Sequence, residues 1–248
     1  MDSGNIGFVL LCAAFVFVMT PGLAMFYGGL VRKKNVVNTM MTSIFIIGVG
    51  IVMWVLFGYS LSFAPSGNAF IGDFRWLGLE GVSLTEGYTD DASIPNMVFS
   101  AFQMMFAVIT PALITGAVAG RMKFKSIFVF TIFWSLIVYY PLAHMVWGQG
   151  GLLGADGIGA LDFAGGDVVH ISSGVSALVL CILLGKRHDY EHSIYRIHNI
   201  PTVVLGASLL MFGWFGFNAG SALAADGLAA HAFMTTGVSA AAAMHSWM

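Results

Sequence analysis

The side chains able to do chemistry in this sequence are few, and His170 is the one placed deepest in a long apolar stretch. Histidine exchanges a proton near neutral pH, and an ionisable group in so apolar a segment is a functional candidate by default. Its neighbours Gly165, Gly166, Ser172 and Ser173 are small enough to border a narrow passage. His170 is therefore either a proton-exchanging group beside such a passage or a packed histidine bonded to a backbone carbonyl.

Asp162 begins the same stretch, eight residues before His170, which is roughly 12 Å along a helix at 1.5 Å per residue. At a helix start its carboxylate accepts hydrogen bonds from free backbone N–H groups and favours the positive end of the helix dipole. The alternative interpretation is that Asp162 gives charge to an external vestibule.

Aromatic side chains supply a second kind of chemistry in other apolar stretches: Phe102, Phe106, Trp147, Trp214 and Phe217, with Ser221 following. Phe102 and Phe106 are four residues apart and share one helical face. Aromatic faces hold a desolvated monovalent cation with about 2 kcal/mol or more, and a serine adds one hydrogen bond. Aromatic belts at membrane interfaces are the alternative, so these residues permit a pathway for a small cation or small neutral molecule without naming it.

Composition decides which elements must position these residues, because 58% of the chain is hydrophobic and only 9% is charged. Soluble domains carry roughly a quarter charged residues, and the mean hydropathy here is +0.87. Such a chain requires the lipid bilayer as its solvent. The 31 glycines lie scattered through the apolar stretches, as expected where helices pack closely. Cys12 and Cys181 form neither a disulfide framework nor a zinc-site pattern.

Seven stretches reach the length of about 20 residues that a helix needs to cross the hydrocarbon core. They cover 6–30, 36–61, 94–119, 126–146, 162–184, 200–217 and 228–247. We therefore expect an all-α integral membrane protein, built as a multispanning helix bundle. The N-terminus lacks the basic region of a signal peptide, so the first stretch is expected to be a retained span.

Basic residues fall in alternate loops and indicate the orientation of the bundle. After spans one, three and five lie Arg32, Lys33, Lys34, Arg121, Lys123, Lys125, Lys186, Arg187 and Arg196, which are all the Lys and Arg residues except Arg75. Because basic loops stay in the cytoplasm, the N-terminus is predicted outside, together with the long acidic second loop. The basic loop 185–199 also carries His188, Asp189, Glu191 and His192 and is either a docking surface or a solvated connector.

Four stretches carry a resemblance to one family: PGLAMFYGGLVRKKN at 21–35, AHMVWG at 143–148, GALDFAGGDVVH at 159–170 and GWFGFNAGSA at 213–222. Together they closely resemble the ammonium transporters of the Amt/Mep group rather than their Rhesus relatives, in collinear order over the whole chain. The resemblance implies no enzyme activity, cofactor, metal or nucleic-acid partner. Its implied partners are two further copies in a homotrimer and a PII-type regulator at the cytoplasmic face.

At the outer side, the resemblance implies that Trp147, Phe106 and Ser221 form a recruitment site for ammonium, with Phe102 nearby. Asp162 would lie beside this site as a supporting carboxylate rather than as a direct ligand. A hydrogen-bond acceptor in the site helps to separate ammonium from potassium, which has no protons to donate.

Further inside, the resemblance implies that Phe106 and Phe217 form a stacked aromatic gate, with Trp214 as a supporting aromatic. His170 would be the first of two pore histidines that conduct a proton or stabilise the substrate. Carrying a bare ammonium ion through an apolar pore has a large desolvation penalty. Removing its proton and moving neutral ammonia across the plasma membrane avoids most of that penalty.

Members of this family usually have eleven spans in two inverted five-helix repeats, so the chain is expected to hold the first repeat and the start of the second. The second pore histidine and the cytoplasmic tail are then expected outside these 248 residues, since His231 and His245 are misplaced for that role. We expect an incomplete sequence, or else a naturally truncated, nonfunctional transporter. An ammonium sensor that signals to a cytoplasmic module is the other alternative within the family.

Other classes of membrane protein fit the composition but fail on particular residues. A retinal protein needs a lysine in its last span, and the last lysine here, Lys186, lies in a loop. An aquaporin-type channel needs paired Asn-Pro-Ala motifs, which the sequence lacks. A structural membrane subunit leaves the four collinear motifs unexplained.

Overall fold

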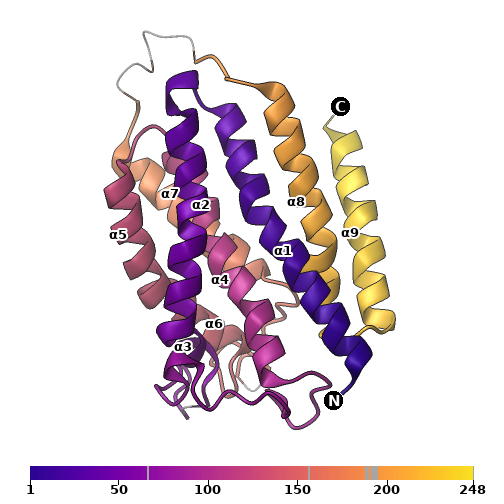
Figure 1. Ribbon diagram of the computed structural model, residues 1–248. Helices are drawn as coiled ribbons and strands as arrows, with labels where there is room; N and C mark the ends of the chain where they lie inside the picture. Colours follow the sequence, from indigo (N-terminus) through magenta and orange to yellow (C-terminus); the bar gives the residue numbers. More distant parts are fainter. Residues whose placement is uncertain (66, 156, 188–189, 191–194, 248) are drawn as a thin grey trace.

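The computed structural model describes residues 1–248 except 66, 156, 188–189, 191–194 and 248, and every regular element within the described residues is a helix (Figure 1). The α-helices are α1 Ser3–Leu30, α2 Val36–Met53, α3 Tyr59–Phe63, α4 Asn96–Val118, α5 Phe124–Trp134, α6 Tyr140–Trp147, α7 Ser172–Leu184, α8 Ile200–Gly220 and α9 Gly227–Ser246. Three short π-helical segments continue them without a break: η2 Trp54–Gly58, η4 Ser135–Tyr139 and η5 Gly166–Ile171. The remaining elements are the 3₁₀ segments η1 Lys33–Asn35 and η3 Leu77–Leu79.

Six continuous helical stretches in the described part of the chain are long and apolar enough to cross a membrane. They are Ser3–Leu30, Lys33–Phe63, Asn96–Val118, Phe124–Trp147, Gly166–Leu184 and Ile200–Gly220. These correspond to the first six predicted spans, so the all-helical multispanning architecture is confirmed. The seventh predicted span coincides with α9, whose many small and polar residues make it less apolar than the other six. Its crossing of the membrane stays a prediction.

Capping side chains explain where two of the later helices begin. Asn199 accepts a hydrogen bond from the backbone N–H of Thr202 at the start of α8. Asp226 accepts one from the N–H of Ala229 at the start of α9. Both are short polar residues that satisfy an otherwise free N–H of the first helical turn. Each cap therefore fixes the residue at which its helix begins, and the two helices run antiparallel.

The fifth span begins later than the predicted residue 162. Gly165 has a φ of +100° in the left-handed region, which L side chains avoid and which stops the helical stretch from reaching back to Asp162. The helical backbone begins at Gly166, so the expected spacing of 12 Å along a helix between Asp162 and His170 is wrong. The capping interpretation is confirmed, because the Asp162 carboxylate accepts hydrogen bonds from backbone N–H groups at the start of this span.

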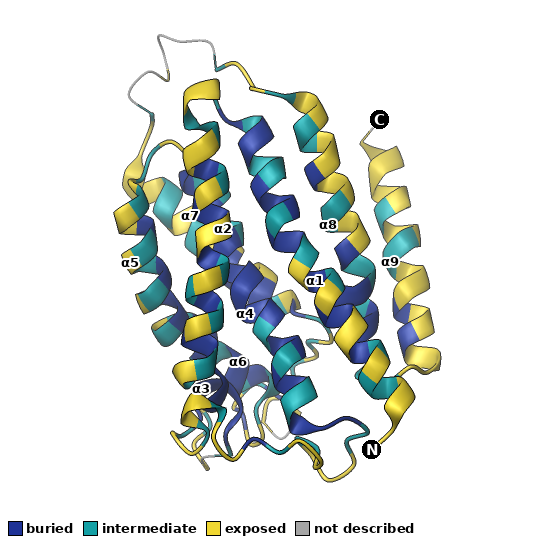
Figure 2. Ribbon diagram, in the orientation of Figure 1, coloured by how far each residue is buried: buried dark blue, intermediate teal, exposed yellow. Residues whose placement is uncertain are grey.

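Helix α4 lies at the centre of the bundle and contacts α1, α2 and α7, so most of its residues are buried (Figure 2). Helix α1 packs against α8 through glycines. A Cβ at Gly206 would lie 2.3 Å from the backbone nitrogen of Phe26, and one at Gly213 would lie 2.6 Å from the carbonyl oxygen of Phe15. The close helix contact predicted from the glycine content is therefore present between α1 and α8.

The outer sides of α7 and α8 expose large apolar side chains (Figure 2). Leu178, Ile182 and Leu183 on α7 are 60%, 70% and 76% exposed, and Val204 on α8 is 58% exposed. Large exposed apolar side chains in such number mark contact with lipid or with another apolar surface rather than with water. The described surface therefore agrees with a multipass membrane protein.

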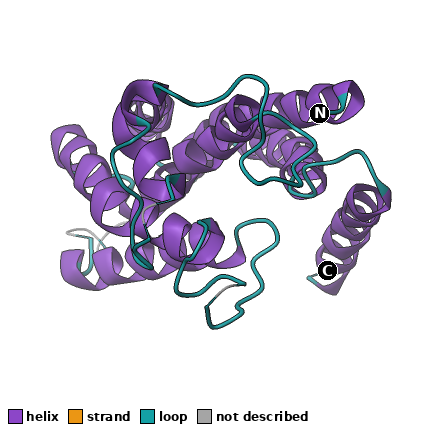
Figure 3. Ribbon diagram, turned by 90° about the horizontal axis from the view of Figure 1, so that it is seen from below, coloured by secondary structure: helices purple, strands orange, loops and turns teal. Residues whose placement is uncertain are grey.

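The loops separate into two groups at opposite ends of the bundle. The N-terminus lies at the same end as the loops 64–95 and 148–165, and the basic loops after α1, α4 and α7 lie at the other end (Figure 1). Seen from below, the first group of loops runs across the ends of the helices (Figure 3). The predicted placement of the basic loops on one face is thus present. His188, Asp189, Glu191 and His192 lie outside the described residues.

Candidate functional site

Four aromatic side chains from three helices meet near the end of the bundle that carries the long loops 64–95 and 148–165. Phe102 and Phe106 on α4 have ring centroids 4.9 Å apart at an interplanar angle of 67°. Phe106 also lies 6.1 Å from Trp147, the last residue of α6, at 86°, and 4.3 Å from Phe217 on α8, at 39°. Phe106 and Phe217 are each only 1% exposed, so these two rings close the inner side of the group.

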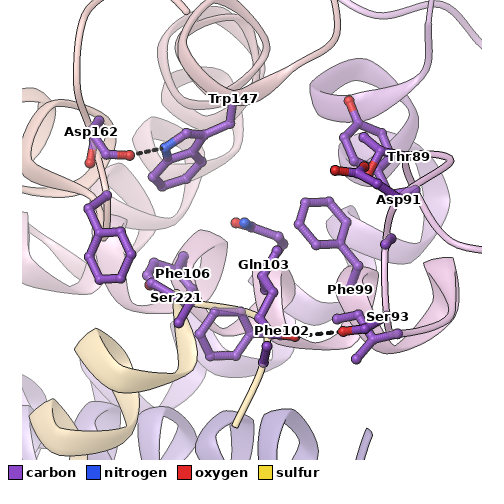
Figure 4. Close-up of a pocket in the computed structure, with 17 residues that line it drawn as sticks. Thr89, Asp91, Ser93, Phe99, Phe102, Gln103, Phe106, Trp147, Asp162 and Ser221 are labelled. Carbon is purple, nitrogen blue, oxygen red and sulfur yellow. Dashed lines mark hydrogen bonds between the residues drawn. The ribbon is translucent and has the colours of Figure 1, made fainter. Parts of the chain in front are cut away.

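A cavity of about 430 Å³ opens above these rings (Figure 4). Its walls include all five residues predicted to bind or support a substrate: Trp147, Phe106, Phe102, Ser221 and Asp162. Asp91 also lines it, and the described lining contains no lysine or arginine. Two carboxylates and several aromatic faces without a nearby cation make the cavity attractive to a small positive ion.

Ser221 follows α8 directly and presents a hydrogen-bond acceptor to the cavity. Its hydroxyl donates to the carbonyl oxygen of Phe217 at 2.9 Å. With the hydroxyl proton engaged in this bond, the oxygen lone pairs are the part of Ser221 left for a ligand. The geometry therefore favours a ligand that donates hydrogen bonds from N–H or O–H groups.

Trp147 is held in place by the loop that precedes η5. Its indole N–H donates to the backbone carbonyl oxygen of Asp162 at 2.9 Å. The Asp162 side chain in turn accepts four backbone N–H bonds, two on each carboxylate oxygen, at 2.5 to 3.0 Å. Its acceptor positions are largely used by the protein, so Asp162 supports the wall of the cavity and has little capacity left to bind a ligand directly.

His170 lies in η5 and extends the series of rings away from the cavity. Its imidazole stacks on Trp214 with centroids 5.5 Å apart and planes within 9°, and it lies 6.0 Å from Phe217. Neighbouring rings therefore lead from Trp147 through Phe106 and Phe217 to His170. His170 is exposed, and no hydrogen bond joins its imidazole to another described residue. Within the described residues the imidazole thus packs on aromatic rings, and its proton-exchanging role stays a prediction.

Tyr88, Asp91 and Gln103 are among the residues of the cavity wall that were not predicted from the sequence. Tyr88 stacks on Phe99 with centroids 4.8 Å apart at 6°, and it accepts the backbone N–H of Gln149 at 3.0 Å. Burial raises the pKa of Tyr88 to about 12, so its phenol group stays neutral at physiological pH. Asp91 lies beside it in the acidic loop. Gln103 lies between Phe102 and Phe106 on α4, and its polarity inside an apolar span was the available signal.

The fold and this cavity define a multipass membrane protein with a cation-attracting site at one end of its helix bundle. The sequence profile of the Ammonium Transporter Family matches residues 7–248. The chain therefore belongs to the ammonium transporter family. Among the residues that the structure describes, no three His, Cys, Asp or Glu side chains are grouped so that they could hold a metal ion.

Relatives with known names agree with this membership. The chain is 52% identical to an ammonium transporter of Bacillus subtilis and 45% identical to one of Aquifex aeolicus, covering all of this chain and 60% and 57% of those proteins. The crystal structure of Candida albicans Mep2 matches with a TM-score of 0.83 and 34% identity, over 94% of this chain and 51% of that one. A structure named Sensor Amt Protein matches with a TM-score of 0.83 and 28% identity, over 96% and 59%. The chain thus spans little more than half the length of its relatives.

Proposed function

We propose that this chain recruits ammonium from outside the plasma membrane and forms the first part of a path along which ammonia crosses it. The observation that carries the proposal is the continuous series of rings from the cavity to His170. The N-terminus and the acidic loop lie outside in this proposal, because the basic loops gather at the opposite end (Figure 1) and basic loops stay in the cytoplasm.

Ammonium would bind in the cavity against the faces of Trp147, Phe102 and Phe106, with one N–H donated to the Ser221 oxygen. Aromatic faces attract the charge while the acceptor reads the N–H group, which potassium lacks. The desolvation penalty for holding the ion here is small, because the cavity is open on its outer side. The charge attraction is the same for an alkali cation, so the hydrogen bond is what favours ammonium over it.

Passage beyond the cavity requires the ion to lose a proton. The Phe106 and Phe217 rings are almost fully buried, and placing an unpaired charge between them has a large desolvation penalty. Ammonium therefore separates into neutral ammonia, which passes the rings when they move apart, and one proton. His170, beyond Phe217, accepts that proton and relays it while ammonia crosses separately.

Trp147→Leu tests the recruitment step. The variant removes the indole face and its hydrogen bond to the Asp162 carbonyl, so ammonium affinity of the purified chain is expected to fall about tenfold or more, as for the loss of roughly 1.4 kcal/mol or more from a partly desolvated cation–aromatic contact. Binding is measured by titration with ¹⁵N-ammonium. Unchanged affinity would remove the cavity from the proposed function.

His170→Ala tests the proton relay in the complete protein. We expect transport current driven by ammonium to disappear or fall strongly, because the proton path loses its first titratable group. Methylammonium uptake is followed in parallel as a tracer of the neutral path. Undiminished current would show that His170 does not relay the proton.

Assembly and regulation enter the proposal through family membership. We infer a homotrimer in the lipid bilayer and a PII-type regulator bound at the cytoplasmic face. A sensing role is the second candidate function, favoured by the match to the structure named Sensor Amt Protein. An ammonium-dependent signal from a cytoplasmic module attached to the complete protein, without ammonium transport, would favour sensing over transport.

A further inference from the structure

Gln103 is a polar residue in the wall of the cavity that the proposed path does not yet use. Gln103 lies on α4, between Phe102 and Phe106 in the sequence, and is only 8% exposed. Figure 4 shows its carboxamide directed into the cavity, between Trp147 and Phe99. A polar side chain is thus placed among the aromatic rings that attract a cation.

The side-chain oxygen of Gln103 is buried and has no hydrogen-bond partner among the described residues. Buried amide groups are nearly always bonded, and an unsatisfied one requires a physical reason. The two ends of a carboxamide exchange by a half turn about the last side-chain bond, so Gln103 can direct its oxygen at a ligand. A ligand that donates a hydrogen bond in this cavity would satisfy that oxygen.

We propose that Gln103 is a further binding and specificity-determining residue of the ammonium site, whose carboxamide oxygen accepts an N–H of the ion. This inference rests on the proposed function of the cavity. Ser221 supplies one hydrogen-bond acceptor, whereas the aromatic rings attract the charge and offer no oxygen or nitrogen lone pair to an N–H group. Gln103 therefore gives the site a second group that distinguishes an ion with N–H donors from one without them.

A neutral acceptor also suits the chemistry that follows binding. A carboxylate at position 103 would stabilise the charged ammonium form and raise the pKa of the bound ion. An amide oxygen accepts the same hydrogen bond without a negative charge, so the ion still loses its proton readily. The amide thus contributes recognition without holding the ion in its charged state.

The experiment compares cation binding by the purified full chain and three variants. Gln103→Met keeps the length of the side chain and removes the acceptor, whereas Gln103→Glu keeps an acceptor and adds charge. Ser208→Ala is the matched control, since it removes an exposed hydroxyl on α8 that bonds only to its own helix. Ammonium is titrated with ¹⁵N detection, tetramethylammonium by competition as a cation without N–H donors, and potassium as a second competitor.

We expect Gln103→Met to bind ammonium about tenfold more weakly, as for the loss of one hydrogen bond to a charged group, while its tetramethylammonium affinity changes less than twofold. Gln103→Glu should bind ammonium and potassium more tightly and reduce the preference between them several-fold. Ser208→Ala should match the unmodified chain for all three cations.

Each other outcome has a definite meaning. If the unmodified chain binds no ammonium, the proposed function fails and the inference fails with it. If the unmodified chain binds ammonium and Gln103→Met binds it equally well, the inference is overturned and the proposed function stands. Equal losses for ammonium and tetramethylammonium would assign Gln103 a purely structural role. Should Gln103→Met fail to fold, an unchanged ammonium-to-potassium preference in Gln103→Glu would overturn the inference.

Discussion

Asp162 is predicted to act on the cavity through the backbone, and two substitutions separate this role from direct ligand binding. Its Oδ1 accepts the N–H groups of Gly165 and Gly166, and its Oδ2 accepts those of Asp167 and Val168. In Asp162→Asn one oxygen keeps its pair of bonds, and the new NH₂ group faces two N–H donors. In Asp162→Ala all four N–H groups are left to water.

The expected losses follow from the number of bonds removed. Replacing an aspartate at a helix start by alanine lowers stability by about 0.5–2 kcal/mol. Because this carboxylate accepts four bonds at 2.5 to 3.0 Å, we expect Asp162→Ala to lose about 2 kcal/mol of unfolding free energy, at the upper end of that range. Asp162→Asn, which keeps half of the bonds, should lose about 1 kcal/mol.

Unfolding in mixed detergent micelles, followed by circular dichroism and tryptophan fluorescence, measures these differences. Asp167→Asn is the control, because it removes the same charge without removing the acceptor of the four bonds. Ammonium affinity is measured on the same samples. An Asp162→Asn chain as stable as the unmodified one, with ammonium binding lost, would refute the supporting role and make Asp162 a direct ligand.

Two further predictions concern packing and pH. Gly213→Ala should destabilise the chain by about 1–3 kcal/mol, because its Cβ would lie 2.6 Å from the Phe15 carbonyl oxygen. Gly48→Ala is the control, since a Cβ there meets nothing within 4 Å, and its unfolding should show no loss of stability. Equal losses in the two variants would contradict the close α1–α8 contact. Hydrogen bonding to Arg75 lowers the pKa of the partly exposed Asp73. Its small contribution to stability is therefore present above the unfolded pKa of about 3.9 and is lost as pH falls through the lower folded value. Asp73→Asn should therefore lose less than about 1 kcal/mol at neutral pH and match the unmodified chain in strong acid; a loss that persists in acid would contradict this origin.

The sequence predicted the helical elements well because their signal is local. Twenty apolar residues need a helix to satisfy their backbone in lipid, wherever the rest of the chain lies. The start of the fifth span was misplaced because Phe163 and Ala164 extend the apolar stretch back to Asp162, whereas the left-handed backbone of Gly165 ends the helical conformation there. The three π-helical segments were not predicted, since such segments depend on packing between helices rather than on composition.

The candidate site was predictable in its members and not in its contacts. The spacing of Phe102 and Phe106 gave their shared face directly. The 4.3 Å approach of Phe106 to Phe217 joins helices more than a hundred residues apart, and only family resemblance pointed to it. Gln103 was not predicted because a neutral amide has neither the charge nor the ring that distinguishes the other candidates. Its significance depends on an oxygen without a hydrogen-bond partner among the described residues, which only the three-dimensional structure shows.

The glycine contact between α1 and α8 has a consequence for biosynthesis. Gly206 packs on Phe26, so α1 leaves the ribosome about 180 residues before this partner is made. At 5–20 residues per second this wait lasts roughly 10–40 s. During that time the glycine-binding face of α1 lies open to lipid or to the insertion machinery. Nascent chains arrested before residue 200 should therefore be the species most accessible to membrane chaperones and proteases.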